Sequence, residues 1–235
     1  MKQLKMMMAM LAVCVLAACS SDDETTGCEE YDAEYYQIKY YSRPPYADLD
    51  QGYWYKDNTK EVFFKLTPNT EAPYQLLVCP KNDKGRRTLE YMAEKDGGVI
   101  LDIRKQVHYF DMNFTDSTTH YFVTSTKYFE SPDLYVSDNY FSTECGMREG
   151  DFCRIVPTIL INLNAGADIR NIEAEYKDVM TLRYTNQLGS NYTIYYFDCH
   201  LNNSYEALRL ADELYRRDDV NWADTDKYSP VYFDI

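Results

Sequence analysis

Apolar and polar positions alternate most clearly in the last third of the chain. The run PTILINLN at 157–164 is a short apolar segment typical of a strand. After it, Ile169, Ile172 and Tyr176 recur at helical spacing, which predicts a helix with one apolar face over 165–178. The runs VMTLRYTN and NYTIYYFDC then flank the turn residues QLGS and predict a hairpin of two strands.

A second helix and a last strand follow this hairpin. Asn203 has the side chain of an N-cap, and Glu206 comes three residues later, as in a capping box. The run VNWADTDKY supplies the final strand. The predicted buried stripe of the helix consists of Ala207, Leu210, Ala211 and Leu214. The order β-α-β-β-α-β is that of the ferredoxin-like fold, so we expect an α+β protein whose antiparallel sheet carries both helices on one face.

The preceding region has a looser pattern. YWYKDNTKEVFFKL predicts two strands around a turn, YQLLVC a strand, RRTLEYMAEKDGG a short helix, and VILDIRKQVHYFDM and HYFVTSTKYF further strands. We expect a β-rich N-terminal domain over 31–130, in which the strand-helix-strand-strand pattern from Tyr74 to Thr126 is a degenerate copy of the C-terminal unit. A linker over 131–156, which lacks sustained periodicity, leads to the ferredoxin-like domain at 157–235.

The N-terminus has the layout of an export signal. Lys2 and Lys5 precede an apolar run at 6–18 that is too short to span a bilayer comfortably. The residues LAAC, which end at Cys19, resemble a bacterial lipobox. We therefore expect cleavage of a signal peptide at 1–18 and lipidation of Cys19. A soluble secreted protein without a lipid is the alternative.

The residues after Cys19 favour a surface location. SSDDE resembles the acidic signal that sends some lipoproteins to the outer face of the outer membrane, and residues 19–30 form a polar tether. The predicted location is the outer membrane, with the chain anchored through the lipid on Cys19 and facing outward.

Charge and cysteine content narrow the partners further. The net charge is −14, and no basic stripe of the kind that neutralises phosphates is present, so no nucleic-acid partner is expected. Export permits disulfides, and Cys145 and Cys153, which flank GMREGDF, could pair. The three histidines are scattered, and DCH at 198–200 is typical of a strand end. We therefore expect neither a metal nor a cofactor.

No catalytic signature stands out in the sequence. The chain has no GxSxG elbow, no HExxH, no P-loop and no dinucleotide fingerprint, so enzymatic activity is not expected. Its 24 tyrosines fit the packing of half-buried strands. Exposed aromatic platforms for sugars are the alternative use of these tyrosines.

Several stretches of the chain resemble one family. They are the strand-helix ILINLNAGADIRNIEAEY, the strand YTIYYFDC and the stretch EALRLADELYRRDDVNWADTDKYSP, together with YFESPDLYVSDNYF further upstream. They are similar to the last part of the proregion that precedes the catalytic domain in subtilisin-like serine proteases of lipoprotein type. The positions that keep the family's shape are Val220, Trp222, Ala223 and Asp226. Asp224 and Thr225 depart from it, because Glu and Pro are usual there.

The resemblance implies a ferredoxin-like prodomain that packs its sheet on the protease, lays its tail through the substrate groove, assists folding and inhibits. The tail would consist of Tyr228, Ser229, Pro230, Val231, Tyr232, Phe233, Asp234 and Ile235. No protease segments follow this tail, so we expect a stand-alone proregion, a shortened relative or a truncated product. The hairpin residues NQLGSN lack the acid that caps protease helices in subtilisin complexes, which weighs against inhibition.

Three hypotheses follow. The leading one is a non-catalytic cell-surface lipoprotein that acts through protein contacts, in its sharpest form as a trans-acting inhibitor or chaperone of a subtilisin-like protease. The alternative is a surface lipoprotein that binds glycans or peptides, which an exposed row of tyrosines would favour. The third is an enzyme with an unfamiliar motif, which needs a pocket holding a group of strongly perturbed pKa.

Overall fold

The structure is a computed structural model, and it describes residues 33–56, 61–95, 98–109, 117–141, 152–188 and 192–228. The predictions for the signal peptide, Cys19, the tether and Cys145 lie outside these residues. Residues 33–235 cluster as one compact unit, which we treat as an N-terminal half up to residue 141 and a C-terminal half from residue 152. Antiparallel sheet dominates it and helices are few, so the predicted α+β class is confirmed. Within the described ranges, no helix has the length and apolar character needed to cross a membrane.

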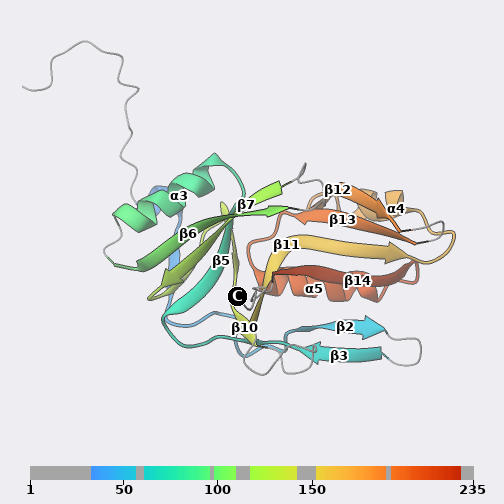
Figure 1. The fold of residues 1–235 in the computed structure, drawn as a ribbon, viewed down its shortest axis with the longest axis horizontal. Helices are drawn as coiled ribbons and strands as arrows, with labels where there is room; N and C mark the ends of the chain where they lie inside the picture. Colours follow the sequence, from blue (N-terminus) through green and yellow to red (C-terminus); the bar gives the residue numbers. More distant parts are fainter. Residues whose placement is uncertain are drawn as a thin grey trace, which may run out of the picture. The chain divides into compact units, whose positions relative to one another are not determined.

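The C-terminal half contains the elements that the sequence predicts, in the predicted order. They are β11 (Phe152–Leu163), α4 (Ile169–Tyr176), β12 (Met180–Gln187), β13 (Thr193–Cys199), α5 (Ser204–Tyr215) and β14 (Val220–Tyr228). The strands lie in the order β12-β13-β11-β14, and every neighbouring pair is antiparallel (Figure 1).

Both helices of this half pack on one face of the sheet, around an aliphatic core. On the sheet, Ile159 and Ile161 of β11 are fully buried. The residues that pack against them from the helices are Ile172, Tyr176, Leu210, Ala211 and Leu214. The predicted apolar stripes of both helices are therefore confirmed. Asn203 is the N-cap of α5, as predicted, and its side chain accepts a hydrogen bond from the amide of Glu206.

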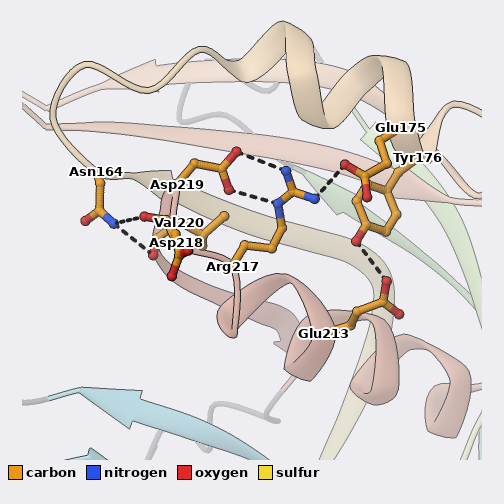
Figure 2. Close-up of polar contacts among 8 residues, drawn as sticks. All are labelled: Asn164, Glu175, Tyr176, Glu213, Arg217, Asp218, Asp219 and Val220. Carbon is orange, nitrogen blue, oxygen red and sulfur yellow. Dashed lines mark hydrogen bonds and ion pairs between the residues drawn. The ribbon is translucent and has the colours of Figure 1, made fainter.

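A network of polar contacts fixes the end of this half where α4, α5 and β14 meet (Figure 2). Figure 2 shows the guanidinium of Arg217 between Asp219, at 2.9 Å, and Glu175 of α4, at 2.6 Å. The hydroxyl of Tyr176 donates to Glu213 of α5 at 2.8 Å. Asp219 forms a half-buried ion pair with Arg217, and Arg217 joins the helices to the start of β14.

Strand β11 begins earlier than predicted, at Phe152 instead of Pro157. Its first residues pair with β10 (Tyr140–Phe141), which belongs to the stretch expected to be a linker. Its register against β14 shifts between Ile155 and Ile159. Pro157 lies within that shift, as expected for a residue that has no N–H to donate to a sheet.

The N-terminal half contains a second antiparallel sheet. Its elements are β5 (Tyr74–Pro80), α3 (Asp83–Glu94), β6 (Ile100–Tyr109), β7 (Ser117–Ser125) and β9 (Leu134–Ser137). The strand order is β6-β7-β5-β9. The linker predicted over 131–156 is wrong at β9, because this strand pairs with β5 at the centre of the half. All four of its side chains are buried, so it shows no alternation by which the sequence could reveal it.

One helix, α3, covers this sheet together with an aromatic cover. The cover has two parts. The first is the segment 36–46, which starts at the last residue of the short helix α2 (Ala33–Tyr36) and includes β1 (Lys39–Tyr41). The second is β8 (Tyr128–Glu130), which pairs with β1. Its Tyr46 and Tyr128 are buried in one cluster with Leu89 and Met92 of α3. The aromatic cover and the helix therefore share the same face of the sheet.

The remaining strands lie beside α5. The predicted hairpin is confirmed as β2 (Gly52–Lys56) and β3 (Glu61–Lys65), and β4 (Thr67–Pro68) then pairs with β10. Trp54 of β2 stacks on Tyr215 of α5 at 6.3 Å between ring centroids. A Cβ at Gly52 would lie 2.2 Å from the carbonyl oxygen of Phe64, so the close approach of the two strands requires glycine.

Candidate functional site

The sheet of the C-terminal half has a second face, which neither α4 nor α5 covers. Successive side chains of a strand point to opposite faces, so the residues between the buried isoleucines of β11 point away from the helices. Leu160 of β11 is the central one, and its direct partners across the sheet are Tyr196 of β13 and Asp224 of β14. Tyr184 of β12 lies opposite Tyr196, and their ring centroids are 5.5 Å apart.

A second set of aromatic side chains extends this row. Trp222 of β14 lies opposite Asn162 of β11, and its indole N–H donates to the hydroxyl of Tyr192 at 3.0 Å. The amide of Asn162 donates to the carbonyl of Thr193 at 2.7 Å and accepts from Asn221 at 2.8 Å. We call Leu160, Tyr184, Tyr192, Tyr196 and Trp222 the tyrosine face. Its members are held by cross-strand contacts and are half-buried, except Tyr192, which is 40% exposed.

Charges border the tyrosine face in pairs. At one side Asp224 accepts from the ammonium of Lys227 at 2.5 Å, which in turn lies 3.7 Å from the ring centroid of Tyr53. Burial raises the pKa of Asp224, and the charge of Lys227 opposes the rise. At the other side Arg183 binds Asp198 at 3.0 Å. The face itself is therefore aromatic and aliphatic between two ion pairs, with Asp226 as a further acid near Tyr196.

The tail implied by the family resemblance begins next to this face. Its first residue, Tyr228, is half-buried: its ring lies 5.1 Å from that of Phe122, and its hydroxyl accepts from Gln106 at 2.6 Å. Tyr228 therefore packs on the sheet of the N-terminal half, and its contact with a partner stays a prediction. The other predicted tail residues, 229–235, lie outside the described residues.

A pocket lies between the two halves, and we call it the seam pocket. Its volume is about 530 Å³, within the range of small-molecule sites. The end of β5 and the first turn of α3 form one wall, β6 and β7 a second, and β11 with the end of β13 a third. Its polar side chains include Lys81, Arg86, Lys105, His120 and His200.

The two cysteines of the seam pocket are not reactive thiols. Cys79 and Cys199 both line the seam pocket, but burial raises the pKa of each thiol, which keeps it protonated and unreactive. Cys153 is also buried, and its predicted disulfide partner Cys145 lies outside the described residues, so that pairing stays a prediction.

The DCH residues do not converge. Asp198 binds Arg183, Cys199 points into the core, and Nε2 of His200 lies 2.9 Å from Oγ1 of Thr181. Their place at the end of β13 is the predicted one. In the parts of the chain that the structure describes, no three His, Cys, Asp or Glu side chains gather as metal ligands.

A buried carboxylate, Asp138, was missed by the sequence reasoning. It is 1% exposed, and neither carboxylate oxygen has a hydrogen-bond partner at normal geometry within the described residues. Burial raises its pKa to about 7; the nearby Tyr46 hydroxyl opposes the rise and the charge of Glu130 adds to it. The only signal was an acid inside the aromatic stretch YVSDNYF. Asp138 lines neither the seam pocket nor the two smaller pockets beside β2 and β6.

The comparisons with known proteins add no relative to this picture. The chain was compared with models of protein families, with curated proteins and with solved structures. None of the three comparisons finds a match.

Proposed function

We propose that the chain is a non-catalytic cell-surface lipoprotein whose C-terminal half binds a protein partner through the tyrosine face. The partner to test first is a subtilisin-like protease, toward which the chain would act as a separate prodomain-like inhibitor or chaperone. The observation that carries the proposal is the aromatic sheet face opposite the two helices.

The arrangement of elements supports a prodomain-like fold. The order β-α-β-β-α-β, the strand order β12-β13-β11-β14 and two helices on one face are those expected of a ferredoxin-like arrangement, and they support the proposal. The N-terminal half has the corresponding strand order β6-β7-β5-β9 with one helix, which supports the proposal that it is a degenerate copy. In the prodomain family it is the sheet that packs on the protease, which is why the free face is the proposed interface.

The composition of the face favours a protein over a small ligand. The cores of protein interfaces are enriched in Tyr and Trp and depleted of unpaired charge. The tyrosine face is rich in these residues. Asp224 and Asp198 beside it are each bound to a cation of the same sheet, while Asp226 is a further acid near Tyr196. The hydrogen bonds of Trp222 and Asn162 hold the face in one conformation, which lowers the entropy lost on binding.

The experiment is inhibition of a panel of subtilisin-like proteases by residues 20–235. We expect sub-micromolar inhibition that falls at least tenfold in Tyr192→Ala. The matched control is Tyr35→Ala, because Tyr35 is 38% exposed, close to the 40% of Tyr192, but lies in the N-terminal half. Deletion of 229–235 separates the tail's contribution from that of the face. Digestion of the intact chain without inhibition would contradict the proposal.

A glycan-binding lipoprotein is the second candidate, favoured by the pocket of about 240 Å³ beside the β2–β3 hairpin. Trp54, Phe63 and Tyr205 give it aromatic walls, and Asp212 and Arg209 give it polar groups for sugar hydroxyls. Binding to soluble polysaccharides that Trp54→Ala abolishes, and Tyr192→Ala leaves unchanged, would establish this function in place of the first.

A further inference from the structure

Lys81, a residue of the seam-pocket wall, carries an ammonium that makes no ion pair at short range with any described residue. Lys81 follows β5 directly, and its half-buried ammonium donates to the carbonyl of Pro132 at 3.0 Å and to the side chain of Asn202 at 2.6 Å. Both acceptors are neutral. Within the described residues no carboxylate lies at ion-pair distance from this ammonium, although acids outnumber bases in the chain by 38 to 24. Glu206 and Asp133 act on it only from further away, and burial lowers its pKa.

Two more positive features face the same pocket. Lys105 of β6 lines it and makes no ion pair with any described residue. The first turn of α3 also lines it, through Asn82, Asp83 and Arg86, so the positive end of a helix of 12 residues is directed there. The pocket is therefore positive relative to the acidic remainder of the chain.

The acids in the pocket wall do not cancel this charge. Asp198 is bound to Arg183 at 3.0 Å, and Asp83 lies 3.9 Å from Arg86. Arg86 also binds Glu90 at 2.6 Å, and the Asp83 side chain is 88% exposed, so water screens its charge. Lys81 and Lys105 remain without a carboxylate at ion-pair distance among the described residues. A partly desolvated ammonium whose nearest described carboxylates lie beyond ion-pair distance is costly, and an anion beside it would compensate its charge.

The uncharged residues of the wall indicate the rest of the ligand that carries the acidic group. Tyr121, Tyr135 and Pro157 give the pocket an apolar surface, and Thr119 adds a hydroxyl. A volume of about 530 Å³ accommodates more than an inorganic ion. The complementary molecule therefore combines one acidic group with an apolar or ring-shaped body.

We propose that the seam pocket binds a small organic anion, with the acidic group at Lys81, Lys105 and the start of α3 and the body against Tyr121 and Pro157. This site is separate from the tyrosine face and does not depend on the function proposed for that face. Carboxylates and phosphates share the required chemistry, and the experiment distinguishes them.

The experiment is binding to the intact chain by calorimetry, with benzoate, phenyl phosphate, inorganic phosphate and the neutral benzyl alcohol as probes. We expect benzoate or phenyl phosphate to bind at millimolar concentration or below, and to raise the melting temperature in proportion to occupancy. The stronger of the two identifies the acidic group. Benzyl alcohol, which lacks the charge, is expected not to bind.

Variants then locate the site. We expect Lys105→Gln and Lys81→Gln each to weaken binding about tenfold, as loss of one charge contact does, while Lys39→Gln, at an exposed position of β1, leaves it unchanged. Lys81 also supports the fold through Pro132 and Asn202, so the exposed Lys105 decides the result if Lys81→Gln does not fold. The proposal is overturned if neither organic anion binds up to 10 mM (about 2.7 kcal/mol), or if Lys105→Gln binds as tightly as the unchanged chain.

Discussion

The two halves of the molecule cover similar sheets in different ways. The C-terminal sheet, β12-β13-β11-β14, has two helices on one face, whereas the sheet β6-β7-β5-β9 has one helix and the aromatic cover. The core of the C-terminal half is mainly aliphatic, with Ile159, Leu210 and Leu214. The core of the N-terminal half includes Tyr46, Tyr74 and Tyr128.

The difference has a consequence for polar groups. A helix satisfies its own backbone, so aliphatic side chains are enough to dock it. Tyrosines bring hydroxyls into the core, and each hydroxyl needs a partner. Tyr46 and Tyr128 share a hydrogen bond, and the hydroxyl of Tyr74 donates to the carbonyl of Ser42 in the aromatic cover. We conclude that the aromatic cover takes the place of a second helix on this sheet, and that it requires buried hydrogen bonds for its hydroxyls.

The largest loss of stability is expected when a buried ring of the aromatic cover is removed. Tyr128→Ala deletes a fully buried ring that contacts Tyr41, Tyr46 and Tyr74, and should lower the free energy of unfolding by about 3–5 kcal/mol. Leu214→Ala, in the helix-covered core, should cost about 2–5 kcal/mol. Urea denaturation measures both. A loss below about 1 kcal/mol for Tyr128→Ala would show that the aromatic cover does not stabilise the sheet.

The second effect is a pH dependence that belongs to the N-terminal half. The pKa of Asp138 is about 7 in the folded chain, above its ordinary value of 3.8, so the folded state holds this proton more tightly. The buried, protonated Asp138 therefore leaves the folded chain at its full stability below about pH 4. As the pH rises toward about 7, the free energy of unfolding falls, because the carboxyl must then lose its proton in a buried place. Asp138→Asn should therefore stabilise the chain at pH 8, by at most about 4 kcal/mol, and have little effect at pH 4.

Denaturation midpoints between pH 4 and 8 test this pH dependence. The control is Asp50→Asn, whose side chain is 84% exposed and pairs only with Lys65, so its effect should stay below about 1 kcal/mol at every pH. An equal response of Asp138→Asn at pH 4 and pH 8 would contradict the buried, proton-holding role of Asp138.

A smaller loss of stability is expected when the N-cap of α5 or of α3 is removed, and the two losses should differ. Asn203→Ala removes the N-cap of α5 and also the contact of its amide with Glu130 in the N-terminal half, and should cost about 1–2 kcal/mol. Asn82→Ala removes the cap of α3 and a contact with Asp133, both at an exposed position, and should cost about 1 kcal/mol. Thermal melts rank the two. A smaller loss for Asn203→Ala than for Asn82→Ala would indicate that the contact with Glu130 contributes nothing.

The smallest effect is expected on the tyrosine face. Tyr192→Ala removes a side chain that is 40% exposed, and the stability should change by about 0.5 kcal/mol or less. Protease inhibition should nevertheless fall tenfold. A loss of stability as large as that of Leu214→Ala would make Tyr192 part of the core and remove it from the proposed interface.

The C-terminal half could be predicted because its signals are local. The cap at Asn203, the stripe of α5 and the spacing of Ile172 and Tyr176 each lie within a few residues and agree with the structure. The aromatic cover could not, because Tyr46 meets a partner 82 residues away, at Tyr128. Strand β9 was hidden because every side chain in it is buried.

The candidate sites depend on details that the sequence does not display. Tyr184 joins the tyrosine face because the register between β12 and β13 shifts after Leu182. A shift of one residue reverses the face to which a side chain points. The seam pocket draws its wall from residues as distant in the chain as Lys81 and His200, which only the packing of the two halves brings together.

The most direct test of the central claim is hydrogen–deuterium exchange of residues 20–235, alone and with a subtilisin-like protease whose catalytic serine is blocked. The claim is that the partner binds the tyrosine face of the C-terminal half and not the aromatic cover of the N-terminal half. The predicted result is slower exchange across β12, β13 and β14 and no change in the aromatic cover. Slowing confined to the aromatic cover, or no slowing with any protease of the panel, would contradict it.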